Sequence, residues 1–244
     1  MLYFVSILTA LGAYLLGSVN TSIILSKSIY GEDIRTSGSG NAGATNMLRT
    51  HGKGIAVATL ICDVLKGTLA VIIAMWLDLI LAPYFKNASL SAAESTYLLG
   101  NFKYIAGVFV ALGHDFPIFF GFRGGKGVAT SLGVILALNP KIGLIVLAAA
   151  VLVMALSRYV SLGSVTAAAL YPFVLFTYII ASGENPADEI PYLIMAFILA
   201  VLLILKHHTN IAKLKNGTEN KLFAKKQPQT DAKSAEITES ADDR

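Results

Sequence analysis

Residues 2–26, LYFVSILTALGAYLLGSVNTSIILS, contain no charged side chain, and Lys27 is the first basic residue of the chain. A helix needs about 20 apolar residues to cross the hydrocarbon core of a bilayer, so this stretch is long enough to span it. No basic segment precedes the stretch, which favours an uncleaved signal anchor over a cleaved signal peptide. We therefore expect residues 2–26 to form the first membrane span, with the N-terminus outside the cell.

Six further apolar runs follow, separated by polar or charged connections. They lie at residues 54–81, 99–113, 128–139, 141–157, 162–182 and 191–206, and the segment from Pro83 to Thr96 is predicted to be a polar external loop. The runs at 99–113 and 128–139 are short for a full span, so we expect them to be tilted or supported by neighbouring helices. Together with an apolar content of 55% and a mean hydropathy of +0.66, the pattern predicts an all-α, polytopic membrane helix bundle of about seven spans.

Basic residues are unevenly shared between the two ends of this predicted bundle. The loops at 27–53, 114–127 and 158–161 and the segment from 206 onward would share one face. Most of the juxtamembrane Lys and Arg residues lie there, whereas the other face carries Lys86, Lys103 and Lys141. The positive-inside rule makes the basic face cytoplasmic, and with it the C-terminus. We expect one membrane domain over residues 1–226 and a disordered, polar cytoplasmic tail over residues 227–244.

Two features of the composition argue against nucleic-acid binding and against an intramolecular disulfide. The sequence pI of about 9.1 could indicate nucleic-acid binding, but the basic residues lie beside membrane segments, where they set topology and attract anionic lipids or substrates. We therefore expect no nucleic-acid partner. Cys62 is the single cysteine, so an intramolecular disulfide is excluded.

The first predicted cytoplasmic loop contains SGSGNAGATN at residues 37–46, followed shortly by Arg49. Glycines allow successive backbone N–H groups to converge on one point, and the Ser, Thr and Asn side chains add further donors. No acidic side chain lies inside the segment, and Arg49 can bind a phosphate through two parallel hydrogen bonds. The segment predicts an anion site, with phosphate as the expected ligand. The alternative is a flexible turn in which Arg49 is only a topology charge.

The second loop, GHDFPIFFGFRGGKGVAT at residues 113–130, also combines glycines with a cation. Lys126 lies between glycines, so its ammonium can approach a phosphate through a compact pocket of backbone groups. A Walker A nucleotide loop is not indicated, because Phe120 stands where its first Gly is needed and Gly127 where Ser or Thr is needed. His114 could be a base or a structural histidine at the membrane boundary.

A third polar segment, KHHTNIAKLKNGTE, follows the last apolar run at residues 206–219. His207, Asn210 and Glu219 supply polarity that a basic lipid-binding segment would not need, and such a juxtamembrane segment is the alternative. The pair of His207 and His208 gives little support for a metal, because no other ligand has suitable spacing.

Four further polar residues lie near or inside the apolar runs. Asp63 and Lys66 are three residues apart and can neutralise one another on one helix face. Ser161 and Ser164 could reach the cytoplasmic pocket, or they could cap the start of a helix.

The three segments, in this order, resemble those of the bacterial acyl-phosphate:glycerol-3-phosphate acyltransferases, small integral-membrane enzymes of phospholipid synthesis. The resemblance covers nearly the whole chain. Residues 37–49 resemble the first motif of the family, residues 113–130 the second and residues 207–219 the third. In the third motif the family has Arg where this chain has His208 and Lys213.

The resemblance implies transfer of a fatty acyl group from acyl phosphate to the sn-1 hydroxyl of glycerol 3-phosphate, which gives lysophosphatidic acid and inorganic phosphate. The implied partners are glycerol 3-phosphate, acyl phosphate and membrane lipid, with no cofactor, no metal and no obligate protein partner. The implied location is the bacterial plasma membrane, with the active-site loops in the cytoplasm.

The resemblance also implies roles for individual residues. Catalysis would involve His207, Asn210 and Lys126, with hydrogen-bond donors there stabilising the developing oxyanion. Ser39, Arg49 and Lys126 would bind the phosphate of glycerol 3-phosphate. The full set implied in substrate binding is Ser37, Ser39, Gly40, Asn41, Gly43, Thr45, Asn46, Arg49, His114, Gly124, Gly125, Lys126, Gly127, Ser164 and Glu219.

The sequence does not identify the general base. Soluble and peripheral glycerolipid acyltransferases use a His followed five positions later by Asp, but in this chain the positions five after each His are Ala, Phe, Ala and Lys. Phosphate is a good leaving group, and the phosphate of the substrate could itself accept the hydroxyl proton. Substrate-assisted transfer is therefore the hypothesis.

Two other classes of function are open to a chain of this kind. A transporter of a phosphorylated solute could use a polytopic bundle with a basic cytoplasmic mouth. Against it, the motifs share one predicted face, and the apolar runs hold few polar residues beyond Asp63 and Lys66. A non-catalytic lipid-binding scaffold would need the basic tail but not the two Gly-rich loops.

Overall fold

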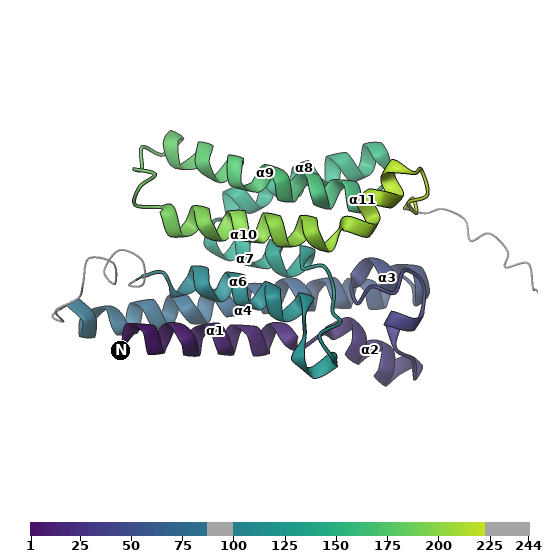
Figure 1. Cartoon of the computed structure of the whole chain (residues 1–244), viewed down its shortest axis with the longest axis horizontal. Coiled ribbons are helices and arrows are strands. Elements are labelled where there is room, and N and C mark those ends of the chain that lie inside the picture. Colours follow the sequence, from purple (N-terminus) through teal and green to yellow (C-terminus); the bar gives the residue numbers. More distant parts are fainter. Residues whose placement is uncertain (87–99, 223–244) are drawn as a thin grey trace, which may run out of the picture.

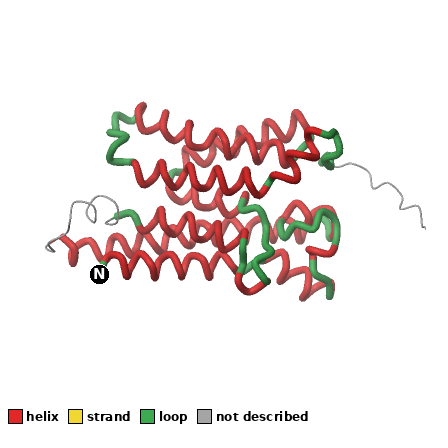
Figure 2. The backbone as a smooth tube through the Cα atoms, in the orientation of Figure 1, coloured by secondary structure: helices red, strands yellow, loops and turns green. Residues whose placement is uncertain are grey.

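The computed structural model describes residues 1–86 and 100–222, and every regular element in these two ranges is a helix (Figure 1, Figure 2). The longer helices are α1 (Leu2–Ser18), α2 (Thr21–Tyr30), α4 (Lys53–Lys86), α6 (Phe102–Asp115), α7 (Val128–Leu138), α8 (Pro140–Ser157), α9 (Val160–Ala181) and α10 (Ile190–Lys206). The short elements are α3 (Ala44–Thr50), α11 (His208–Lys215) and the 3-10 turns η1 (Ile34–Thr36) and η2 (Ile118–Phe120). The predicted all-α class is confirmed.

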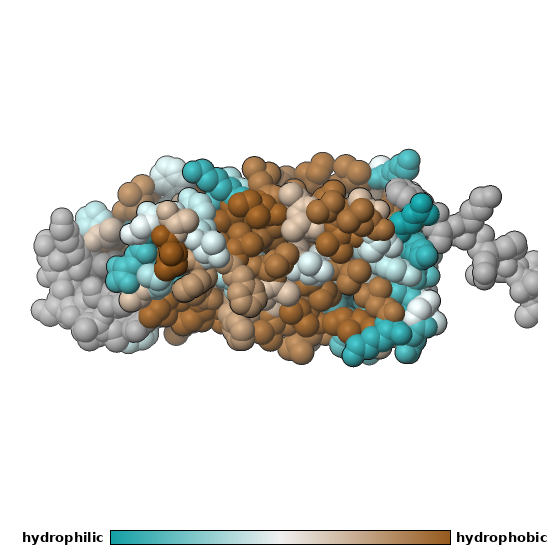
Figure 3. All heavy atoms as spheres, turned by 90° about the horizontal axis from the view of Figure 1, so that it is seen from above, coloured by the Kyte–Doolittle hydropathy of each residue, from teal (hydrophilic) through white to brown (hydrophobic). Residues whose placement is uncertain are grey.

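The lengths and surface of the helices are those of a membrane protein. Five helical segments are long and apolar enough to cross a bilayer: Leu2–Tyr30, Lys53–Tyr84, Phe102–Phe120, Pro140–Ser157 and Val160–Ala181. A sixth span would combine α10 and α11, which are bent by 57° at their junction, and α7 is a shorter apolar helix. Apolar side chains cover the middle of the surface and polar side chains collect toward its ends (Figure 3). The seven-span count stays a prediction.

Two boundaries differ from the sequence-based prediction. The run at 2–26 is divided, because the buried Asn20 side chain accepts a hydrogen bond from the N–H of Ile23 at 3.2 Å and starts α2. The predicted loop beginning at Pro83 is wrong at its start, since α4 continues to Lys86. Pro83 lies inside α4, where its missing N–H removes one backbone hydrogen bond. The rest of that loop and the tail at 227–244 lie outside the described residues.

The helices form two groups with α7 between them (Figure 1). Helix α1 packs on α6, and α4 packs on both α6 and α7, while α9 packs on α8 and α10. The connections that carry the three predicted motifs lie together at one end of the bundle (Figure 1). We call this end the motif end, made of residues 31–52, 116–127, 158–159 and 207–222. The structure thus brings the predicted loops to one face.

Helix α7 approaches α4 closely because glycines lie at their contact. A Cβ atom on Gly133 would lie 2.0 Å from the carbonyl oxygen of Val64, and one on Gly67 would lie 2.2 Å from that of Thr130. Small residues permit such approaches between membrane helices. Because α7 begins directly after the second Gly-rich loop, this contact sets the position of that loop.

We expect Gly133→Ala to destabilise the protein, because the added methyl group must displace the backbone of α4. Overpacking of this kind costs about 1–3 kcal/mol. Gly12→Ala on α1 is the matched control, since no heavy atom lies within 4 Å of its ideal Cβ position. Thermal unfolding of both variants in one detergent checks the expectation. Equal midpoints would contradict the close approach of the two helices.

Candidate active site

The first Gly-rich loop is held in shape by Asn46, a buried side chain of α3. Its Nδ2 donates to the carbonyl oxygens of Ile34 and Ser37 at 3.1 and 3.0 Å, and its Oδ1 accepts from the N–H of Ser39 at 2.8 Å. Gly38 has a φ of +60°, and a Cβ there would lie 2.3 Å from Asn46 Oδ1, so the turn requires glycine. These hydrogen bonds all go to the loop itself, and Asn46 therefore shapes it.

The second Gly-rich loop folds back onto the end of α6. The N–H of Gly125 donates to the carbonyl oxygen of His114 at 3.1 Å, and the N–H of Gly124 donates to that of Asp115 at 3.3 Å. A Cβ on Gly125 would lie 2.0 Å from His114 Nε2 and 2.7 Å from the carbonyl oxygen of Ala42, which belongs to the first loop. The two loops therefore meet at Gly125, where no larger residue fits without a shift.

Arg35 ties the two loops together, a role that the sequence analysis missed. Its Nη1 donates to the carbonyl oxygens of Phe120 and Arg123 at 2.7 and 3.0 Å. The Asp33 carboxylate accepts from Arg35 Nε and Nη2 at 2.9 and 2.8 Å, and the guanidinium holds the pKa of Asp33 well below its usual range. The sequence pattern that could have indicated this role is Asp-x-Arg just before the glycines, but by itself the pattern indicates only a basic residue that sets the membrane topology.

Side chains from three separate segments form a connected polar chain at the motif end. The Lys126 ammonium contacts the side-chain oxygen of Asn210. Asn210 Nδ2 donates to Glu219 Oε1 at 2.8 Å, and Ser161 Oγ donates to the same carboxylate oxygen at 3.0 Å. The structure therefore joins the second loop, the start of α9 and the third motif at one place.

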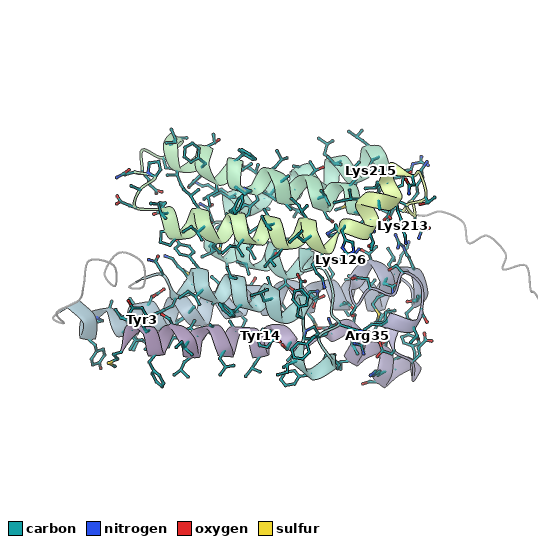
Figure 4. The ribbon with its side chains drawn as sticks, in the orientation of Figure 1. Tyr3, Tyr14, Arg35, Lys126, Lys213 and Lys215 are labelled. Atoms are coloured by element: carbon teal, nitrogen blue, oxygen red, sulfur yellow. The ribbon has the colours of Figure 1, made fainter. Side chains whose placement is uncertain are left out.

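The surroundings of Lys126 favour an anionic ligand. The pKa of its ammonium is lowered to about 8, mainly by burial and also by the nearby charges of Arg49 and Lys213, while the Glu219 carboxylate acts in the opposite direction. Figure 4 shows Lys126 in the middle of the motif end, with Lys213 on one side and Arg35 on the other. A bound anion would stabilise the charged form of this partly buried lysine, which makes it a candidate site residue.

His207 is buried at the junction of α10 and α11, and its tautomer is set by a backbone partner. Its Nδ1 lies 2.8 Å from the carbonyl oxygen of Leu203. A carbonyl oxygen can only accept, so Nδ1 carries the hydrogen, and Nε2 of the neutral ring is an acceptor. A hydroxyl group of a ligand could donate to this nitrogen.

Asp63, Lys66 and His114 form a buried cluster between α4 and α6, beneath the loops. Lys66 Nζ lies 2.9 Å from Asp63 Oδ1 and 2.9 Å from His114 Nδ1, and it donates to the carbonyl oxygen of Val19 at 3.0 Å. The predicted pairing of Asp63 with Lys66 is confirmed. An ammonium only donates, so His114 Nδ1 accepts and its hydrogen lies on Nε2, beside Gly125.

A cavity of about 580 Å³ extends from the polar chain into the bundle, a volume typical of small-molecule sites. One end is polar, and the remainder is lined by apolar side chains of α4, α7, α8, α9 and α10. The predicted site residues that line it are Ser39, Asn41, Gly43, Thr45, Asn46, Arg49, His114, Lys126, Gly127, Ser164, His207, Asn210 and Glu219.

Four predicted site residues do not line this cavity. Ser37 directs its hydroxyl toward Glu32 at 3.4 Å, and the backbone of Gly124 is bonded to the end of α6. Gly40 lies in the turn of the first loop, and Gly125 lines an adjoining space of about 410 Å³ that also borders Lys126. Across residues 1–86 and 100–222, no group of three His, Cys, Asp or Glu side chains is placed to hold a metal ion.

Comparisons with known proteins point to one family. The sequence model of the family described as glycerol-3-phosphate acyltransferase matches residues 7–217. A glycerol-3-phosphate acyltransferase of Clostridioides difficile (strain 630) is 45% identical over 221 residues, covering 91% of this chain and 97% of the relative. That of Thermoanaerobacter pseudethanolicus is 42% identical over 221 residues, covering 90% and 97%.

Solved structures agree with the sequence relatives. PlsY, an integral membrane glycerol 3-phosphate acyltransferase, superposes in its glycerol 3-phosphate form with a TM-score of 0.71 and 33% identity, covering 89% of this chain and 95% of that one. Its lysophosphatidic acid form gives a TM-score of 0.69 and 31% identity, covering 88% and 94%. The present chain therefore belongs to the glycerol-3-phosphate acyltransferase family.

Proposed function

We propose that this protein transfers a fatty acyl group from acyl phosphate to the sn-1 hydroxyl of glycerol 3-phosphate, releasing lysophosphatidic acid and inorganic phosphate. One observation carries the proposal. The cavity joins a cationic end, lined by Arg49 and Lys126, to an apolar interior within the membrane bundle. Both substrates carry phosphate and one carries a fatty chain, so this single space suits both.

The reaction balances without a cofactor. The sn-1 oxygen forms a bond to the acyl carbon, the bond between that carbon and the phosphate oxygen breaks, and the hydroxyl proton passes to the departing phosphate. Holding both substrates in one cavity makes the step effectively unimolecular, which supplies much of the acceleration. Lys126 stabilises the charge that develops on the phosphate and at the reacting centre.

The third motif positions these groups. The Glu219 carboxylate fixes Asn210, whose side-chain oxygen in turn holds the Lys126 ammonium. His207 Nε2 accepts a hydrogen bond from the glycerol hydroxyl and orients that hydroxyl.

His207→Ala should therefore raise the KM for glycerol 3-phosphate. Near-normal turnover in that variant would show that His207 is not an essential base.

The motif end faces the cytoplasm in this proposal, with seven helices crossing the bacterial plasma membrane. The count of juxtamembrane Lys and Arg supports this orientation. Glycerol 3-phosphate then reaches the site from solution, while acyl phosphate reaches it from the bilayer.

Proteoliposomes separate acyl transfer from transport of a phosphorylated solute. With radiolabelled glycerol 3-phosphate outside and palmitoyl phosphate in the membrane, we expect label in lysophosphatidic acid. We expect no soluble label in the lumen. Accumulation of free glycerol 3-phosphate inside, without lipid product, would support the transporter instead.

The pKa of about 8 for Lys126 predicts a pH dependence of acceptor binding. Phosphate binds the charged form, so the KM for glycerol 3-phosphate should rise as the pH increases through 8, by about tenfold between pH 7 and pH 9. Lys126→Arg should lack this rise, because a guanidinium stays charged throughout the range. An identical rise in both proteins would assign the titration to another group.

A further inference from the structure

The wall that α9 contributes to the cavity changes from small to large side chains along its length. Ser161, Ser164, Ala167 and Ala168 line the cavity with small side chains, and their spacing places them on one helix face. Tyr171 is the next lining residue and the last from α9. It is 1% exposed and among the largest fully buried side chains of the described residues. An open strip of helix surface therefore ends at a bulky ring.

Tyr171 lies deep in the bundle relative to the phosphate end. Ser161, whose hydroxyl donates to Glu219, marks that end. Ten residues of helix separate Ser161 from Tyr171, which is about 15 Å at 1.5 Å per residue. On the neighbouring helices, the deepest lining residues are Ile135 of α7 and Val146 of α8, and both are buried. Several helices thus close the cavity at its deep end.

We propose that Tyr171 determines the length of the acyl chain that the enzyme accepts. The proposal rests on the proposed function, in which the acyl phosphate head lies at Lys126 and its chain lies along α9. A chain that ends at the Tyr171 ring fills the cavity. A longer chain has to displace the packed Tyr171 ring or leave the cavity sideways. A close-packed interior resists displacement of the ring.

The expected size of the effect follows from overpacking. Forcing extra methylene groups into a filled apolar site costs about 1–3 kcal/mol, which is a factor of about 5 to 150 in a ratio of rates. A residue at the end of the cavity should therefore change the preference between donors by at least about fivefold.

The test is a competition between donors in one reaction. Full-length enzyme in nanodiscs receives equal mole fractions of myristoyl, palmitoyl, stearoyl and arachidoyl phosphate with saturating glycerol 3-phosphate. Mass spectrometry then resolves the lysophosphatidic acid products. Product ratios from a single reaction cancel differences in total activity and in the folded fraction of each variant.

Three variants make the competition specific. Tyr171→Leu shortens the side chain at the end of the cavity, and Ala168→Leu fills the strip of surface before it. Ala169→Leu is the matched control, because Ala169 is exposed on another face of α9 and does not line the cavity. If Tyr171→Leu fails to fold, Ala168→Leu still tests the proposal, because it shortens the cavity whereas Tyr171→Leu lengthens it.

We expect Tyr171→Leu to raise the yield from the longest donors relative to palmitoyl phosphate by about fivefold or more, and Ala168→Leu to lower it by a similar factor. Ala169→Leu should keep the wild-type profile. Wild-type profiles in active Tyr171→Leu and Ala168→Leu enzymes would overturn the role of Tyr171. Absence of lipid product from the wild-type enzyme with every donor would instead overturn the proposed function.

Discussion

Lys126→Ala should reduce turnover with glycerol 3-phosphate and palmitoyl phosphate by about 10²–10³-fold, the loss typical of removing one preorganised donor from a reacting centre. Lys126 reaches the cavity from the second Gly-rich loop and is held there by Asn210. Its ammonium is partly buried and contacts Asn210 within the polar chain, so water cannot fully replace it. Initial rates of lysophosphatidic acid formation measure the loss.

Lys215→Ala is the matched control for this experiment. Lys215 is exposed on α11 at the same end of the molecule, and it does not line the cavity. The control should keep a wild-type rate, which separates a site effect from a general change in surface charge. Equal rates in Lys126→Ala and Lys215→Ala would remove Lys126 from the mechanism.

The largest expected effect on stability is that of Lys66→Met. This change leaves the Asp63 carboxylate, which is 2% exposed, without the ammonium that lies 2.9 Å from it. Breaking a buried ion pair in this way costs about 3–5 kcal/mol. The free energy of unfolding in mixed micelles, measured by titration with SDS, should fall by that amount.

Two further variants make the stability prediction specific. Asp63→Asn combined with Lys66→Met should recover part of the loss, because no unpaired buried charge is left. Lys27→Met removes a partner of Asp33 from an exposed position and should cost under about 1 kcal/mol. Equal losses in Lys66→Met and Lys27→Met would show that burial of the cluster has no energetic consequence.

The long apolar runs predicted most of the fold because a bilayer leaves a buried backbone few alternatives to a helix. What they could not predict were features decided by single side chains or by neighbours. The buried Asn20 divides the first run by capping α2, and α4 continues through Pro83. An average hydropathy shows neither the start of a new helix nor the continuation of a helix past a proline.

The chemistry of the site was easier to predict than its contacts. The sequence indicates Lys126 and Asn210 as candidate site residues. Their contact across 84 positions of sequence depends on how α10 and α11 pack against the second loop. Arg35 was missed because its partners in the second loop are backbone carbonyl groups, which any sequence supplies. The sequence did not indicate that Tyr171 lines the cavity, because an apolar run does not show which face of its helix borders a cavity.

The most direct test of acyl transfer from acyl phosphate uses purified protein, glycerol 3-phosphate and one of two donors, palmitoyl phosphate or palmitoyl-CoA, in parallel lipid samples. We predict lysophosphatidic acid and inorganic phosphate in equal amounts from palmitoyl phosphate, and no lipid product from palmitoyl-CoA. Lipid product from palmitoyl-CoA alone, or the absence of lipid product from both donors with folded protein, would contradict acyl transfer from acyl phosphate.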